Sequence, residues 1–117
     1  MIQQASSGRT PAGRSEGGGA VEKVVLFNVW EGVSEAACIA MAERGRAMLG
    51  TIPGVERVSI GVAVKPDARY RYCALLRFRD ADVIAIYNAH PNHDAFLHQE
   101  WEPIVADVLP IEFAMKF

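Results

Sequence analysis

The order in which strand-like and helix-like segments follow one another limits the fold more than any other feature of the sequence. Four segments rich in β-branched and aromatic residues are predicted strands: 21–30, 55–64, 70–79 and 109–117. Three segments with a helical spacing of apolar residues are predicted helices: 34–50, 81–89 and 91–108. The order β-α-β-β-α-β predicts an α+β, ferredoxin-like fold, with a four-stranded antiparallel sheet and helices on one face only.

Local signals support the predicted helices. Ser34 is placed to cap the first helix and Gly50 to end it, while Asp80 can cap the second helix. Pro91 suits the first turn of the third helix, whereas Pro103 should kink or break that helix. The first helix also has an apolar stripe at spacings of three and four residues: Cys38, Ala42, Gly45 and Leu49.

A sheet with helices on one face leaves its other face without cover. The first predicted strand is apolar on both sides, with Val25 and Phe27 on one side and Leu26 on the other. A chain of 117 residues buries only a small core, so a second copy would both cover the bare face and add stability. We therefore expect a homodimer that pairs through its sheet faces into a dimeric α+β barrel.

Composition and charge exclude several classes of protein. The net charge is −2 and the basic residues are scattered, so we expect no nucleic-acid partner. No apolar run reaches the roughly eighteen residues of a membrane span, so we expect no membrane partner. Cys38 and Cys73 form neither a CxxC nor a metal-binding spacing, which favours a reducing, cytoplasmic location. Residues 1–20, rich in Gly and Ser, are predicted to be a disordered leader before a folded domain at 21–117.

Three stretches of the sequence together carry a family resemblance: IPGVERVSIG, YCALLRFRDADVIAIYNAHPNHDAF and PIVADVLPIEFAMKF. The most specific part is Tyr87 followed by the string HPNHDAF, directly after a predicted strand that ends in an aromatic residue. On these motifs the chain resembles the stress-responsive dimeric α/β-barrel (Dabb) domain family over about residues 22–117. The resemblance implies a homodimer in which two sheets pack face to face, in agreement with the bare face deduced above.

The Dabb family includes olivetolic acid cyclase, a polyketide cyclase that closes a ring by intramolecular aldol condensation without a cofactor. The resemblance implies a catalytic pair, His93 and Tyr87, which match the histidine and tyrosine at the centre of that enzyme. Lys23 and Tyr72 stand where that enzyme has two further pocket histidines, so this chain departs from the pattern there. The implied activity is a polyketide cyclase or aldol-type reaction on an apolar carbonyl compound.

The chemistry of the motif can also be argued from its residues. His93 lies in the first turn of the predicted helix, where the helix dipole keeps an imidazole neutral. A neutral imidazole can accept a proton from a C–H next to a carbonyl group. Tyr87 could donate a hydrogen bond to the ring or to the enolate that forms. His90 precedes Pro91 and is pushed out of helical geometry, so we expect it to cap or pack.

Around this pair we expect a substrate-binding pocket for an apolar small molecule. Tyr72 and Lys23 should project from their strands toward the helices, and Lys23 could stabilise an oxyanion. The core of a helix-on-sheet fold can also open into an apolar cavity. The core residues expected to contribute to it are Phe27, Ala74, Leu76, Phe96 and Ile104.

Metal binding is the other chemistry that the motif could support. His90, His93 and Asp94 offer ligands, but the intervening proline spoils a helical spacing and no further ligand cluster stands out. We therefore expect neither a metal nor a cofactor. Three functions remain open: a cofactor-free enzyme with His93 as its general base, a non-catalytic stress-response or small-ligand-binding dimer, and a cofactor-independent monooxygenase-like barrel.

Overall fold

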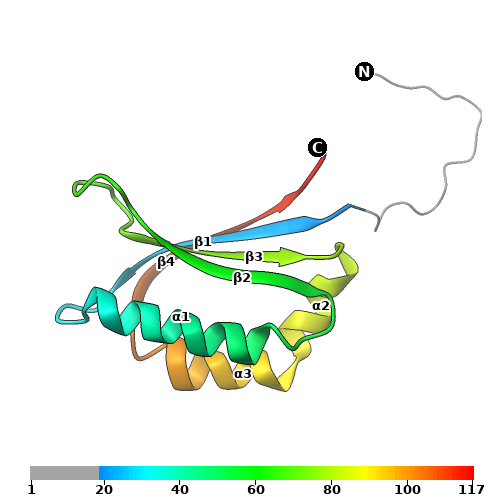
Figure 1. Ribbon diagram of the computed structural model, residues 1–117, viewed down its shortest axis with the longest axis horizontal. Helices are drawn as coiled ribbons and strands as arrows, with labels where there is room; N and C mark the ends of the chain where they lie inside the picture. The colour runs from blue at the N-terminus through cyan, green and yellow to red at the C-terminus, as the bar shows by residue number, and fades with distance from the viewer. Residues whose placement is uncertain (1–18) are drawn as a thin grey trace, which may run out of the picture.

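The computed structural model describes residues 19–117 of the chain. The predicted leader, residues 1–20, lies outside this part except for its last two residues. In chain order the elements are β1 (Val21–Val29), α1 (Glu35–Leu49), β2 (Val55–Val62), β3 (Tyr72–Phe78), α2 (Asp82–Ala89), α3 (Pro91–Phe96), the π-helix η2 (Leu97–Trp101) and β4 (Val105–Ala114). Figure 1 shows a sheet lying over a layer of helices.

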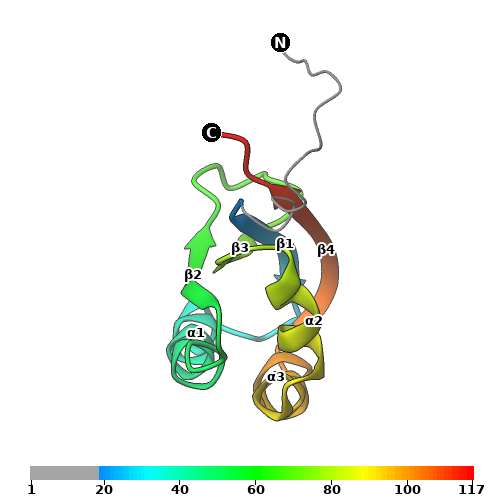
Figure 2. The same cartoon turned by 90° about the vertical axis from the view of Figure 1, so that its right-hand side faces the viewer.

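The four strands form one antiparallel sheet in the order β2-β3-β1-β4. Seen from the end, α1 lies beneath the β2 side of the sheet and α3 lies beneath the β4 side (Figure 2). The helices of residues 19–117 all lie on the same face, which is the helix face; the opposite face is the open face. The predicted α+β, ferredoxin-like fold is therefore confirmed.

The helix ends follow the local signals in the sequence. The Ser34 hydroxyl accepts a hydrogen bond from a first-turn amide at 3.1 Å, and α1 ends at Gly50. The Asp80 carboxylate likewise accepts from an amide at the start of α2, at 3.0 Å. Pro91 is the first residue of α3, where its missing N–H costs nothing.

The third predicted helix is shorter than expected and the last strand is longer. Helix was predicted over 91–108, but the helical path ends with η2 at Trp101, and β4 already begins at Val105. Pro103 explains the break, because its ring removes a backbone donor and clashes with the preceding turn. Beyond it the chain pairs with β1, where Val29 lies opposite Val105.

The core lies between the sheet and the helices. Alternation along the strands brings Phe27 of β1 and Phe78 of β3 to the helix face, where both are fully buried. Gly54 (φ +90°) allows a tight turn beside this core, since a Cβ there would lie 2.3 Å from a Val83 methyl carbon. The other large, fully buried side chains are Cys38, Met41, Ile52 and Val83.

The open face has an apolar centre. By the strand register, Leu109, Ile111 and Phe113 of β4 lie on this face, opposite Leu26 and other residues of β1. Their side chains are 41%, 41% and 47% exposed. The bare apolar surface expected from the sequence is therefore present in the single chain.

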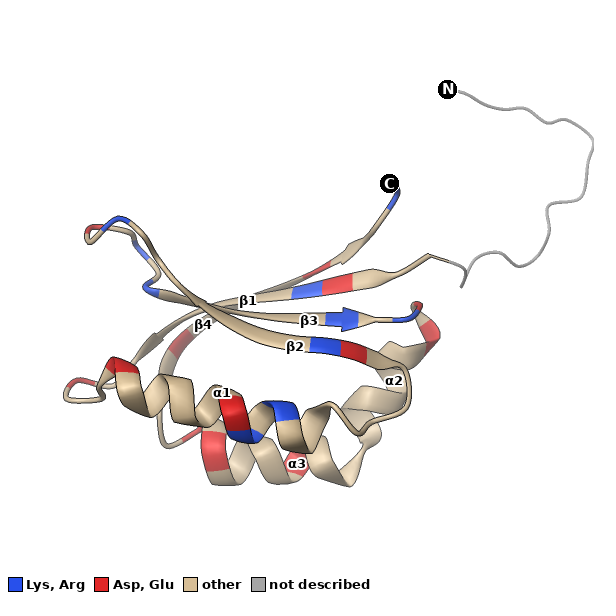
Figure 3. Ribbon diagram, in the orientation of Figure 1, with Lys and Arg blue, Asp and Glu red and all other residues tan. Residues whose placement is uncertain are grey.

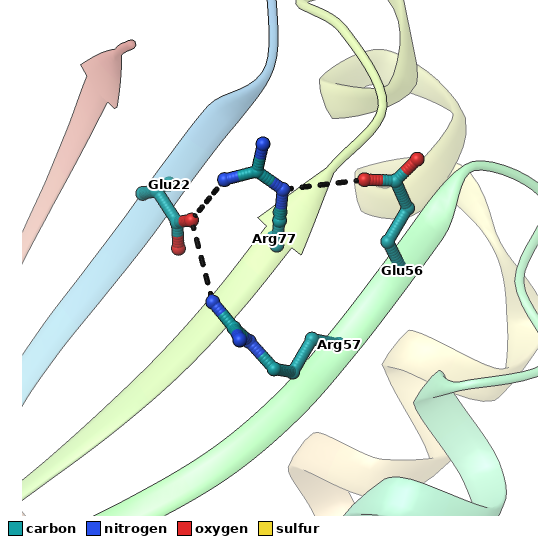
Figure 4. A network of polar contacts seen from close by, with 4 residues as sticks. All are labelled: Glu22, Glu56, Arg57 and Arg77. Atoms are coloured by element: carbon teal, nitrogen blue, oxygen red, sulfur yellow. Dashed lines mark hydrogen bonds and ion pairs between the residues drawn. The ribbon is translucent and has the colours of Figure 1, made fainter. Parts of the chain in front are cut away.

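A network of four charged side chains lies at the end of the open face where β1 begins (Figure 4). Arg77 donates a hydrogen bond to the Glu22 carboxylate at 2.6 Å and lies 3.3 Å from Glu56. Arg57 lies 3.7 Å from the same Glu22 carboxylate. Elsewhere in the described chain, charges of both signs are spread over strands, helices and loops (Figure 3). None of the helices in residues 19–117 is long and apolar enough to cross a lipid bilayer.

Candidate functional site

A cavity of about 300 Å³ lies between the helix face of the sheet and the helices α1, α2, α3 and η2. All four strands contribute to its wall, which is mostly apolar. The main polar groups in the wall belong to Lys23, Tyr87 and His93. A cavity of this size lies at the small end of the range for ligand pockets, so an apolar molecule of modest size would fit.

Most residues predicted for the site line this cavity: His93, Tyr87, Lys23, Ala74, Leu76 and Phe96. Phe27 and Tyr72 do not, because they lie opposite each other on β1 and β3 and stack with ring centroids 5.3 Å apart. Ile104, just before β4, packs against the core and is also outside the wall. Phe27 thus belongs to the core, and Tyr72 and Ile104 pack against the core outside the cavity wall.

Other parts of the wall were not predicted. Gly45 of α1 allows a close approach to α3, since a Cβ at Gly45 would lie 3.0 Å from the Phe96 ring. The apolar stripe of α1 was the available signal, because its members Ala42, Gly45 and Leu49 all line the cavity. Further wall residues that the sequence did not reveal include Met41, Val58, Ile60, Leu97, Trp101, Val108 and Pro110.

Tyr87 and His93 lie side by side in the wall. Their ring centroids are 4.3 Å apart with an angle of 44° between the planes, and Tyr87 also packs on Phe78 at 5.0 Å. Tyr87 is only 5% exposed, yet its hydroxyl has no hydrogen-bond partner within residues 19–117. The two rings therefore touch, but Tyr87 does not donate the predicted hydrogen bond to the His93 ring. Its hydroxyl is left able to donate to a bound molecule, which was the other predicted role.

Burial shifts the pKa values of these two groups in opposite directions. Burial is the main cause that lowers the pKa of His93, and the positive charge of Lys23 lowers it further. Contact with the Asn88 main chain and the charge of Asp94 act in the opposite direction. Burial raises the pKa of the Tyr87 hydroxyl well above its usual range. A lowered pKa of His93 favours the neutral imidazole, and burial is the main cause of this shift.

The residues next to His93 hold the start of α3 in place. The His90 ring accepts a hydrogen bond from the Asn92 amide at 3.0 Å, so His90 caps α3 as expected. The Asn92 side chain donates to the Met48 carbonyl at 3.1 Å and to the Thr51 hydroxyl at 3.0 Å. The start of α3 is thereby fixed against the end of α1.

Lys23 is the third polar group of the wall. Its ammonium nitrogen lies 5.5 Å from the centroid of the Tyr87 ring, within the range of a cation–π contact. Glu112 lies opposite Lys23 in the register of β1 and β4, with 3.7 Å between the charged atoms. The cavity therefore carries a positive charge beside the aromatic pair.

The remaining histidine lies apart from this site. His98 is exposed and sits 3.3 Å from both Asp94 and Glu102; a hydrogen bond with Glu102 is the main cause that raises its pKa. Within the described part of the chain, no group of three or more His, Cys, Asp or Glu side chains is placed to hold a metal ion.

Residues 21–115 match the model of one protein family, the stress responsive A/B barrel domain. No curated protein matches the chain significantly.

Several solved structures share the fold. A dimeric ferredoxin-like protein of unknown function from Thermobifida fusca is 21% identical with a TM-score of 0.70, over 84% of this chain and 92% of that chain. Hydroxynitrile lyase from Passiflora edulis is 13% identical with a TM-score of 0.69, over 85% and 95%. The cofactor-independent oxygenase SnoaB from Streptomyces nogalater is 17% identical with a TM-score of 0.67, over 85% and 95%. At these identities the likeness shows the fold alone.

Proposed function

The chain belongs to the stress responsive A/B barrel domain family, and from this premise and the cavity we propose that it is a small enzyme that works without a cofactor. The proposed reaction is an aldol-type cyclisation, of the polyketide cyclase kind, on an apolar molecule with two carbonyl groups. His93 is the proposed general base, and Tyr87 is the proposed hydrogen-bond donor to the reacting oxygen. The active form is a homodimer.

One observation supports this proposal most: a neutral imidazole and a protonated phenol lie together in the wall of an apolar cavity. The lowered pKa of His93 leaves its ring able to accept a proton at neutral pH. The raised pKa of Tyr87 keeps its hydroxyl protonated and able to donate. Neighbouring groups whose pKa values are pushed apart by their surroundings are typical of an acid–base pair.

In the proposed reaction His93 removes a proton from a carbon next to a carbonyl group. The C–H electron pair forms an enolate, whose oxygen accepts a hydrogen bond from Tyr87. The enolate carbon then attacks the second carbonyl carbon of the same molecule, which closes the ring and leaves an alkoxide. The imidazolium returns its proton to that alkoxide, so the step needs no cofactor and involves no net redox change.

The proposed dimer forms through the open face. A partner would cover the exposed side chains of Leu109, Ile111 and Phe113, and a large apolar patch of this kind is typical of an interface. The Thermobifida fusca relative is described as dimeric. We also propose a cytoplasmic location, which the free thiols of Cys38 and Cys73 support.

Proton exchange into an apolar ketone tests the proposed base directly. The full chain would be incubated with benzylacetone in heavy water, and the signals of protons next to the carbonyl followed by NMR. We expect His93→Ala to slow the exchange by about a hundredfold or more, the usual effect of losing a general base. His98→Ala is the matched control, because His98 is exposed and outside the wall, and should exchange at the wild-type rate.

The pH profile of the exchange gives a second readout. A general base works only when unprotonated, so the rate should fall as the pH drops through the pKa of His93. Because burial lowers that pKa, the fall should come at a lower pH than for an ordinary imidazole, with a flat rate around neutrality. A wild-type exchange rate in His93→Ala would contradict the proposal. So would an exchange rate that begins to fall at a pH above the ordinary pKa range of an imidazole.

Two further measurements, of ligand binding and of oxygen consumption, separate the two other functions that the sequence leaves open. Binding of benzylacetone without any exchange would favour a non-catalytic, small-ligand-binding dimer of the stress-response type. Oxygen consumption in the presence of an electron-rich aromatic substrate would favour a cofactor-independent monooxygenase.

A further inference from the structure

We propose that Lys23 makes the cavity selective for apolar molecules that carry a carboxylate, with the acid group held at Lys23 and the apolar body along the rest of the wall. This inference rests on the proposed function in one respect only, since it takes the cavity to be a ligand site, and it narrows the substrate class from apolar carbonyl compounds to apolar keto acids.

The position of Lys23 in the sheet places a cation where an apolar residue would be expected. Lys23 lies on the helix face of β1, between Leu76 of β3 and Glu112 of β4 in the strand register. Its side chain is only 19% exposed and lines the cavity. No other Lys or Arg of the described chain belongs to the wall. A cation kept in such surroundings loses hydration, and it regains stability only from a partner.

The partners that the chain provides leave much of the Lys23 charge unsatisfied. The Glu112 carboxylate is 3.7 Å away, which is longer than a hydrogen bond, and Glu112 itself is 37% exposed and thus well hydrated. The second contact is with the Tyr87 ring, which offers no lone pair. An ammonium group has three donors, and among residues 19–117 none of them finds an acceptor at hydrogen-bond distance. A bound carboxylate would supply the missing acceptors.

The location of Lys23 would also place the carboxylate of a ligand close to the carbon from which His93 removes a proton. Its ammonium group lies over the Tyr87 ring, and that ring is in contact with His93. The positive charge of Lys23 contributes to the lowered pKa of His93, so the two groups share one end of the cavity. A carboxylate at Lys23 would therefore place its neighbouring atoms near the imidazole, while side chains such as Leu76 and Phe96 contact the apolar body.

A matched pair of probes tests this selectivity without any turnover. Hydrocinnamate and its uncharged analogue hydrocinnamamide have the same apolar body, and their affinities for the full chain would be measured by calorimetry. The wild-type chain should bind the acid about tenfold more tightly than the amide, or more, the usual value of a hydrogen bond to a charged group. Lys23→Met should abolish this preference, because it weakens binding of the acid far more than binding of the amide.

Two further variants control the result. Glu112→Gln should strengthen binding of the acid several-fold, because it removes the carboxylate that competes for Lys23. Lys65→Met removes a lysine in the connection between β2 and β3 and should behave like the wild type. If circular dichroism shows that Lys23→Met does not fold, two other variants test the inference. Lys23→Arg keeps the positive charge and should retain the preference for the acid. Glu112→Gln should increase that preference.

Equal affinity for acid and amide in the wild type, or the same preference in Lys23→Met, would overturn the inference. These outcomes are separate from the fate of the proposed reaction. A chain that prefers the acid but does not exchange ketone protons keeps the selectivity and loses the catalytic proposal. A chain that exchanges protons through His93 but binds acid and amide equally keeps the reaction and loses the selectivity.

Discussion

The two faces of the sheet bury their apolar side chains in different ways. On the helix face, Phe27 and Phe78 are fully covered by elements of the same chain. On the open face, Leu109, Ile111 and Phe113 remain 41–47% exposed. The centre of the helix face is covered within one subunit and has a cavity beside it, whereas the apolar centre of the open face is not covered. The core of the subunit and the proposed dimer interface therefore use separate sets of residues.

Charged groups are also arranged differently on the two faces. The cavity on the helix side has Lys23 in an otherwise apolar wall, where few partners are available. On the open face, Glu22, Arg57 and Arg77 are grouped at the end where β1 begins and pair with one another. The unpaired charge in the apolar wall is the basis of the proposed ligand selectivity, while paired charges beside an apolar centre resemble part of the polar rim of a protein interface.

A charge placed in the centre of the open face should have the largest effect on pairing. Ile111→Asp would put a carboxylate into the proposed interface, where its desolvation costs about 3 kcal/mol or more, so dimer affinity should fall by over about a hundredfold. Analytical ultracentrifugation would show monomers with unchanged circular dichroism. Ile39→Asp is the matched control, because Ile39 is 45% exposed on α1 against 41% for Ile111. Equal dimer affinity in both variants would show that the open face is not the interface.

Truncation of the helix-face core should cost stability rather than pairing. Phe78→Ala removes a fully buried ring that packs on Tyr87, and should lower the free energy of unfolding by about 3–5 kcal/mol. Phe113→Ala removes the same side chain from the open face and should mainly weaken the dimer. Urea unfolding at two protein concentrations separates the effects, because only a loss of pairing depends on concentration. If Phe78→Ala and Phe113→Ala unfolded at the same urea concentrations and with the same dependence on protein concentration, the two faces would not have the separate roles described here.

The smallest effect is expected from the charged end of the open face. Arg77→Met removes the hydrogen bond and ion pairs that Arg77 makes with Glu22 and Glu56. The Arg77–Glu22 pair is partly buried but lies at the edge of the face, where ion pairs contribute little and are screened by salt, so dimer affinity should change by a few-fold at most. The change should be measurable at low salt and disappear at high salt. A large effect that persists at high salt would mean that Arg77 is part of the interface core.

Much of the fold could be predicted because the local signals agree with one another. The alternation of Ala74, Leu76 and Phe78 identifies the buried side of β3 without any knowledge of its neighbours. The start of β4 could not be found in this way. The residues after Pro103 satisfy a helical pattern as well as a strand pattern, and what decides between them is pairing with β1, a contact between distant parts of the chain.

The site shows the same division between local and distant information. The pair Tyr87 and His93 could be located because both lie within one short motif. The limits of the cavity could not, because they depend on which side chains meet across the sheet. Phe27 and Tyr72 are aromatic residues of the kind that line pockets. They lie opposite each other on β1 and β3, however, and their rings stack on each other instead. Gly45 lines the cavity only because Phe96, far along the chain, approaches it.

The double hydrogen bond of Asn92 has a consequence for how molecules enter and leave. One side-chain amide joins the end of α1 to the beginning of α3, next to His93. At a second point Arg44 of α1 pairs with Glu100 of η2, whose residues Leu97 and Trp101 line the wall. Admitting a molecule by parting α1 from this segment would break both contacts, which favours molecules that fit the cavity at its present width.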